Sequence, residues 1–327
     1  MMQFNTYKQQ WLESILQTLW TDWAKLGVAG YTASSPKGTV DHIIDPEALI
    51  LITNTFGRWD ARLFDEMLSW LALNGDLINV KRLQGLSKKF PYPEVLSAIA
   101  VKTSPHHSAW ARLEANHASR TKLFYLTPAK PLPLPENIDP EFEHAGLLRA
   151  PFHDRKMAAE WTPHEPAASV LKLRSLFGIN AHAEVLNYYA DGRKVHASKA
   201  AKDLGFSQRG IQEILTQMTR GGGMKTFTDG RKKLFQINPL TWTGLLPADL
   251  QWKNSTSWGA LQCHLWSLLH HVDTPKTLVL SSVIRSAQES TATQFPEFSD
   301  NALSSFKAEE YIEQWLQWHR SITEITE

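Results

Sequence analysis

Apolar residues recur at helical spacing along most of the chain, which predicts a mainly α-helical protein. The widest stripe lies near the N-terminus, where Trp11, Ile15, Leu19 and Trp23 follow one another every four residues. Such a stripe must be covered, either by its own domain or by a partner. Similar spacing and capping residues predict helices at 45–56, 60–74, 79–89, 93–101, 167–177, 256–271, 275–290 and 308–322.

The segment from residue 181 to residue 219 predicts three short helices in close succession. The first covers 181–190 and the second 198–204, and Gly205 follows where a left-handed helix end is favoured. Ser207 is expected to cap the third helix, which continues to about residue 219 because its apolar residues keep helical spacing.

A hairpin is predicted directly after these helices. A Gly221–Gly223 triplet, which is expected to be a hinge, precedes strands at 224–228 and 231–237. Asp229-Gly230 between them is the pair that a type I′ turn favours. Helix, helix, turn, helix and hairpin is the order of a winged helix-turn-helix. The expected fold is therefore mainly α, with a helical N-terminal domain, this winged helix with its short β-hairpin wing, and a helical C-terminal region.

Basic residues are concentrated in the same segment. From Lys172 to Lys233 there are 12 Lys and Arg against five Asp and Glu, whereas the whole chain has a net charge of +1. Basic runs are often only solvated faces, but these charges fall where a winged helix meets phosphates. We therefore expect double-stranded DNA as the partner.

The sequence also indicates which side chains would contact DNA. The third helix would lie in the major groove, where Arg pairs with guanine and Gln with adenine. The side chains that its core leaves free are Gln208, Arg209, Gln212 and Thr216, and Ser207 at the start of the helix is also expected to contact DNA. Phosphate contacts are expected from Arg193, Lys194, Lys199 and Lys202, and hairpin contacts from Arg231, Lys232 and Lys233.

Motifs for catalysis and metal binding are missing from the sequence. It contains no Walker A, dinucleotide-binding, H-E-x-x-H or G-x-S-x-G motif, so neither an enzyme nor a cofactor is expected. Cys263 and His270 are seven residues apart, as are His264 and His271. On one helix this is about 10 Å, too far for one zinc ion, and no metal site is expected.

Composition and proline content suggest four regions in a cytoplasmic protein. One cysteine fits a reducing compartment, and no apolar run approaches the ~18 residues of a membrane span. Five prolines at 127–140 mark a boundary. We expect a helical domain at 1–126, a Pro-rich linker at 127–166, the winged helix at 167–240 and a helical region at 241–327. Residues 60–90 fit either a second helix-turn-helix or a plain bundle.

Residues 198–237 resemble bacterial winged-helix regulators of the MarR and ArsR type, through the small-residue second helix, the Gly turn, the Ser-capped third helix and the Asp-Gly wing. The pattern from Asp45 to Leu86, followed by the Pro linker and LKLRSLFGINAHAEVLNYYA, resembles regulators encoded beside nucleotidyltransferase toxins of the abortive-infection class. That resemblance implies an antitoxin that represses its own operon and binds a co-encoded toxin. Aromatic terminal helices suit a homodimer or simple core packing. The alternative is a protein-binding winged-helix adaptor of a defence complex, without sequence-specific DNA binding.

Overall fold

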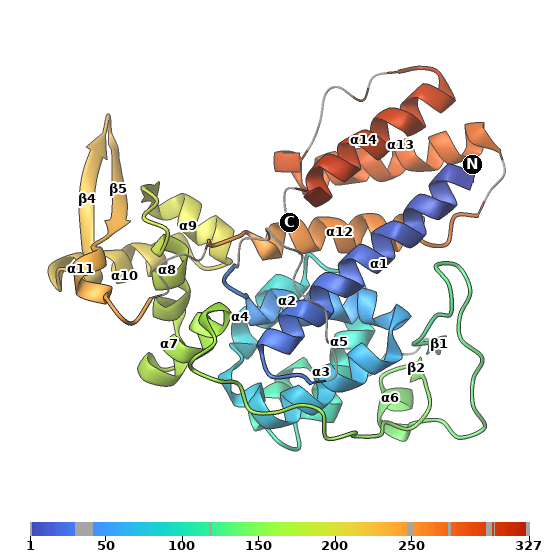
Figure 1. Ribbon diagram of the computed structural model, residues 1–327, viewed down its shortest axis with the longest axis horizontal. Coiled ribbons are helices and arrows are strands. Elements are labelled where there is room, and N and C mark those ends of the chain that lie inside the picture. The colour runs from blue at the N-terminus through green and yellow to red at the C-terminus, as the bar shows by residue number, and fades with distance from the viewer. Residues whose placement is uncertain are drawn as a thin grey trace.

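The computed structural model describes residues 2–29, 42–117, 120–246, 251–273, 276–298, 303 and 305–324. The protein is mainly helical, as expected, with a small antiparallel sheet at one end (Figure 1). Most of the predicted loop at 27–39 and the predicted helix start at residue 275 lie outside the described residues. None of the described helices is both long and apolar enough to cross a membrane.

Helices from both ends of the chain share the larger hydrophobic core. These helices are α1 (Met2–Lys25), α2 (Pro46–Phe56), α3 (Ala61–Asn74), α4 (Val80–Ser87), α5 (Pro93–Thr103), α12 (Ser255–Leu269), α13 (Thr277–Gln294) and α14 (Ala308–Glu324). Helix α2 is buried at every residue, including its polar residues Glu47, Thr53, Asn54 and Thr55. Asp45 and Asn79 cap α2 and α4 with their side chains, as predicted, and Asp60 caps α3 in the same way.

The aromatic stripe of α1 is covered by other helices of the same chain. Trp11 donates its indole N–H to Gln262 Oε1 on α12 at 2.8 Å, and Trp23 donates to Thr53 Oγ1 on α2 at 2.9 Å. Tyr7 on α1 contacts His319 on α14, with 2.6 Å between the hydroxyl and Nδ1. The stripe is therefore core, and it is not left exposed for a partner.

The Pro-rich segment packs against this body, with Phe142 and Leu147 fully buried in the larger core, and contains little regular structure. Its short elements are α6 (Pro140–His144) and β2 (Leu147–Leu148), and β2 pairs in parallel with β1 (Thr121–Lys122), which precedes the segment. Ion pairing of Arg149 with Asp65, at 2.6 Å, fastens the segment to α3. Short 3-10 turns occur at Gly57–Trp59, Gly75–Leu77, Ser108–Leu113, Pro166–Ala168 and Pro296–Phe298.

A second hydrophobic core lies between the elements that follow. They are α7 (Ser169–Phe177), α8 (Ala181–Tyr189), β3 (Val195–His196), α9 (Ala197–Leu204), α10 (Gln208–Arg220), β4 (Met224–Asp229), β5 (Lys232–Ile237) and α11 (Pro239–Trp242). The sheet has the order β3-β5-β4 with both pairs antiparallel, and β3 was not predicted from the sequence. We call residues 169–242 the small lobe and the helices of the larger core the large lobe.

The hairpin turn differs from the predicted one by one residue. Asp229 pairs with Lys232, so the two turn residues are Gly230 and Arg231 and not Asp229-Gly230. Gly230 has a φ of +56°, and Arg231 is not among the described residues with positive φ. A glycine with positive φ at the first turn position is the pattern of a type II′ turn, and it leaves Asp229 free to extend β4.

We predict opposite effects on stability for alanine at two glycines. Gly205 has a φ of +73°, and a Cβ there would come within 2.6 Å of Leu86 Cδ2, so Gly205→Ala should destabilise the protein by about 1–2 kcal/mol or more. Gly85 lies within α4 with nothing near its Cβ position, so Gly85→Ala should stabilise it by up to about 1 kcal/mol. Urea denaturation of both variants checks this, and equal effects would contradict it.

Candidate nucleic-acid interface

Helix α10 presents one apolar and one polar face. Ile211, Leu215 and Met218 are buried in the small-lobe core. Ser207 starts the helix as predicted, because its hydroxyl accepts the Gly210 N–H at 3.2 Å. The Ser207 side chain is therefore engaged in capping, although its backbone lies at the exposed end of the helix.

The predicted major-groove residues lie on the polar face of α10. Gln208 and Arg209 are exposed, while Gln212 and Thr216 are half-buried and lie one helical turn apart. The Arg209 side chain is 91% exposed, and its Nε donates to Glu213 Oε1 at 2.9 Å. This hydrogen bond and the charge of Glu213 raise the pKa of Arg209. Glu213 therefore neutralises part of the charge that this face would offer to DNA.

The hairpin carries a second group of cations. Arg231, Lys232 and Lys233 are all exposed, and none has an ion pair with a described residue. Beyond its base the hairpin projects from the small lobe, away from the large lobe (Figure 1). Lys194 also lies against it, with Nζ 4.3 Å from the centre of the Phe227 ring. The predicted hairpin cations are thus brought together with one of the predicted phosphate-binding residues.

The Gly221–Gly223 triplet at the base of the hairpin is held in place. The indole of Trp242 lies over Gly223, where a Cβ would come within 2.8 Å of it, and the Trp242 N–H donates to the Gly223 carbonyl at 2.9 Å. Packing at this point therefore fixes the position of the hairpin on the small lobe. The triplet does not form the hinge that the sequence predicted.

Three of the residues predicted to contact phosphates bind other groups within the protein. Lys199 pairs with Asp203 at 3.0 Å and Lys202 with Glu297 at 3.5 Å, but both lysines remain about two-thirds exposed. Arg193 is half-buried against the Tyr188 and Trp252 rings, and it donates to the Trp252 carbonyl at 3.1 Å. Arg193 thus joins α8 to the chain that leads into α12, whereas Lys199 and Lys202 keep exposed ammonium groups.

Three further exposed side chains of the same surface were not predicted from the sequence. Gln217 and Arg220 extend the polar side of α10, and Lys225 lies on the exposed part of β4. Arg220 could have been found, because a spacing of 11 residues from Arg209 returns to the same side of a helix. The predicted helix end at residue 219 excluded it.

A buried ion-pair network fixes the small lobe on the large lobe. The Arg174 guanidinium of α7 binds both Glu47 oxygens, at 2.7 and 2.8 Å, and also pairs with Glu184 of α8. Arg82 of α4 pairs with Glu47 at 2.6 Å and with Asp45. Burial alone would lower the pKa values of Arg82 and Arg174, but the neighbouring carboxylates raise both above the ordinary range.

This network reaches the turn before α10. Arg82 Nε donates to the Leu204 carbonyl at 2.9 Å, and the guanidinium lies 5.7 Å from the centre of the Phe206 ring. A second helix-turn-helix at residues 60–90 could not use Arg82 to contact DNA, because Arg82 is fully engaged inside the protein. Lys81, Lys88 and Lys89 remain exposed on α4 and just after it.

The residues considered for a metal site make other contacts. His264 lies 3.0 Å from Ser290 Oγ and His270 lies 2.8 Å from the Pro128 carbonyl. Burial raises the pKa of the Cys263 thiol to about 12 and lowers the pKa of His270 to about 4. Among the described residues, no group of three or more His, Cys, Asp or Glu could hold a metal ion.

No protein-family model matches the chain, and neither the curated proteins nor the solved structures contain a match.

Proposed function

We propose that the small lobe is a winged helix that binds double-stranded DNA through α10 and the β4–β5 hairpin. The strongest support comes from exposed polar side chains on two elements that contact each other. Gln208 and Arg209 are exposed on α10, and three consecutive cations are exposed on the hairpin. An α-helix with its side chains is about 10–12 Å in diameter, which matches the major groove, about 12 Å wide, so the 13-residue helix α10 can lie in it. The basic hairpin would then follow the adjacent backbone.

The two groups of side chains would have different tasks in such a complex. Arg209 can exchange its bond to Glu213 for a guanine edge, and Gln208 and Gln212 suit adenine. Lys199 and Lys202 would contact phosphates, as would the hairpin cations, and such contacts position a protein without reading sequence. The sequence resemblance of residues 198–237 to MarR- and ArsR-type regulators points to the same role.

Substitutions at Arg209 and Glu213 test this arrangement in opposite directions. Arg209→Ala should weaken binding to a selected DNA site by about tenfold or more, because it removes a base contact. Glu213→Gln should strengthen binding, because it removes a carboxylate that both competes for Arg209 and repels phosphate. Fluorescence anisotropy with a site obtained by in vitro selection measures both affinities. Circular dichroism of the variants serves as the control for folding, and unchanged affinities in both folded variants would contradict the assignment of α10.

A second function, the docking of a protein, is favoured by exposed apolar side chains on another part of the small lobe. Leu176, Phe177 and Ile179 are each 43–56% exposed at and after the end of α7, and Leu240 of α11 is 84% exposed. Such a patch suits a second copy of the chain or a protein partner. A co-encoded nucleotidyltransferase-type toxin is supported only by the sequence resemblance. Protein binding with no salt-dependent DNA binding would favour the adaptor function.

A further inference from the structure

An exposed basic patch lies at the C-terminal end of α4 in the large lobe. Lys88 and Lys89 are exposed there, and neither has an ion pair with a described residue. Gly85, one helical turn earlier, is also exposed, and nothing lies within 4 Å of the position that its Cβ would occupy. Lys81 lines a hollow together with the exposed Asp76, whose charge offsets its own. We call Gly85, Lys88 and Lys89 the α4 patch; the proposed contacts of α10 and the hairpin do not include it.

The α4 patch adjoins the turn before α10. Leu86 Cδ2 lies 2.6 Å from the position that a Cβ of Gly205 would occupy, and Arg82 Nε donates to the Leu204 carbonyl at 2.9 Å. The backbone N–H of Lys89 donates to the Leu86 carbonyl at 3.0 Å, so Lys89 follows Leu86 by one turn and their Cβ atoms are roughly 5–6 Å apart. Helix α10 begins three residues after Gly205. Lys89 is therefore placed beside the N-terminal end of α10.

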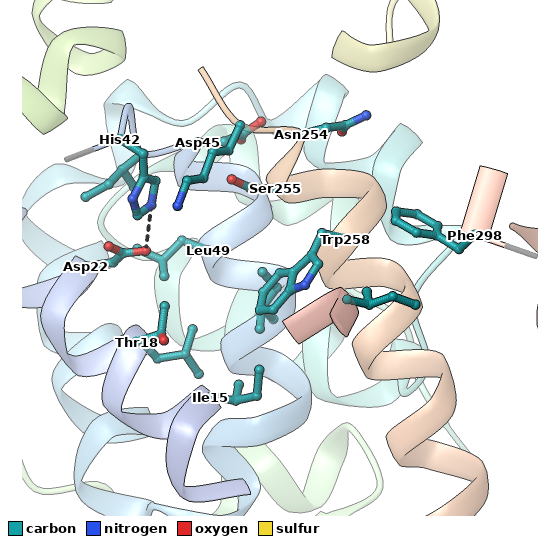
Figure 2. A pocket seen from close by; sticks show the side chains of 15 residues that line it. Ile15, Thr18, Asp22, His42, Asp45, Leu49, Asn254, Ser255, Trp258 and Phe298 are labelled. Carbon is teal, nitrogen blue, oxygen red and sulfur yellow. Dashed lines mark ion pairs between the residues drawn. The ribbon is translucent and has the colours of Figure 1, made fainter. Parts of the chain in front are cut away.

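Contacts of Arg82 hold α4 in this position. Its guanidinium donates to Asp45 Oδ1 at 2.7 Å and to Glu47 Oε2 at 2.6 Å. Asp45 also lines a mainly apolar pocket of about 330 Å³ between α1, α2 and α12, and none of the 15 residues drawn around that pocket belongs to α4 (Figure 2). Arg82 thus anchors the buried side of α4, while the exposed side, which carries the α4 patch, remains open to solvent.

Cations therefore flank α10 at both ends. The hairpin follows the C-terminal end through Gly221–Gly223, and the α4 patch adjoins the N-terminal end, on the side of the large lobe (Figure 1). A helix of 13 residues is about 20 Å long. Of the carboxylates nearby, Glu297 already pairs with Lys202 at 3.5 Å, and Glu94 is half-buried at the start of α5. Because DNA carries one charge per about 1.7 Å of its axis, its backbone continues past both groups of cations.

We infer that the α4 patch binds the sugar-phosphate backbone of the DNA duplex that α10 contacts, beyond the N-terminal end of α10 and opposite the hairpin. The large lobe then forms part of the DNA-binding surface and extends the contact along the duplex. This inference rests on the proposed function, because the duplex must occupy α10 for the patch to meet it. Phosphate contacts carry no base information, so the patch adds affinity for every DNA sequence.

Substitutions at Gly85 test the patch with little risk to the fold, since there is open space for a side chain. Gly85→Glu places a carboxylate four residues before Lys89, the better orientation for a helical ion pair, and next to the DNA. In fluorescence anisotropy it should weaken binding of the selected site by about fivefold or more and flatten the slope of log affinity against log salt by about one unit. Gly85→Gln, which has the same size and no charge, should bind like the wild type, and Gly85→Lys should bind more tightly.

Removal of the two lysines gives an independent measurement. Lys88→Gln/Lys89→Gln should flatten the salt slope by about two units, because two phosphate contacts are lost. The matched control is Lys130→Gln/Lys307→Gln, which removes the same net charge from exposed positions outside α4 and the small lobe and should keep the wild-type slope. In hydroxyl-radical footprinting, the patch variant should lose protection at one flank of the site, while the control should keep the full footprint.

Arg209→Ala, measured in parallel, separates this inference from the proposed function. A wild type without salt-dependent DNA binding would overturn both. If Arg209→Ala weakens binding while Gly85→Glu and Lys88→Gln/Lys89→Gln keep the wild-type affinity, slope and footprint, then α10 binds DNA and the α4 patch does not. An equal loss of affinity in Gly85→Gln and Gly85→Glu would mean that the size of the side chain and not its charge is responsible, which would also overturn the inference.

Discussion

Replacing Arg174 by Met is expected to lower the free energy of unfolding by about 3–5 kcal/mol, the usual cost of removing one partner from a buried ion pair. The Arg174 guanidinium is fully buried and binds Glu47, Glu184 and the Leu77 carbonyl. Without it, the Glu184 carboxylate is left buried without a cation, and Glu47 keeps only Arg82. Since these residues join both lobes, we expect a single unfolding transition of lower midpoint in urea.

Two further variants separate this effect from a general loss of packing. The double variant Arg174→Met/Glu184→Leu should be more stable than Arg174→Met alone, because it also removes a carboxylate that has no other cation. Glu310→Gln, which removes an exposed ion pair with Lys307, should leave the unfolding free energy unchanged within error. If Arg174→Met unfolded at the same urea concentration as the wild type, the network would not join the lobes as described.

Helix starts could be predicted from the sequence because each depends on neighbouring residues. Asp45, Asn79 and Ser207 cap their helices as expected, since a cap needs only its own side chain and the next few N–H groups. The hairpin was located for the same reason, but its turn was predicted one residue early. An Asp-Gly pair favours a type I′ turn locally, and the pairing of β4 with β5 decides the register.

The cations used inside the protein could not be recognised in the sequence. Arg174 and Glu47 are 127 residues apart, and Arg82 and the Leu204 carbonyl are 122 apart, so no local pattern connects them. Arg174 was included among the 12 basic residues at 172–233 that suggested a basic surface, but its side chain is buried. Its partner Glu184 is buried as well, so the local excess of positive charge on the small lobe remains.

Nothing in the sequence indicates that helices from both ends of the chain share one core. A wide apolar stripe on α1 requires a cover but does not identify it, and that cover includes α12 and α14, more than 200 residues further along the chain. Exposure on α10 and on the hairpin was predicted more successfully, because a helical period and a short turn determine which side chains face solvent.

The DNA-binding proposal depends most directly on the hairpin cations. Neutralising Arg231, Lys232 and Lys233 together as Gln should weaken binding on the order of a hundredfold at moderate salt, because each phosphate contact releases condensed counterions. The loss should be similar for all DNA sequences, since phosphate contacts carry no base information. A matched control is Lys307→Gln, which removes an exposed cation of the large lobe.

The decisive measurement is the affinity of wild type and the triple hairpin variant for the selected DNA site as a function of salt concentration. We expect log affinity to fall steeply with log salt for the wild type, and the slope to become flatter by about two to three units in the variant. Lys307→Gln should keep the wild-type slope. A wild-type affinity that does not depend on salt, or a triple variant with an unchanged slope, would contradict DNA binding by α10 and the hairpin.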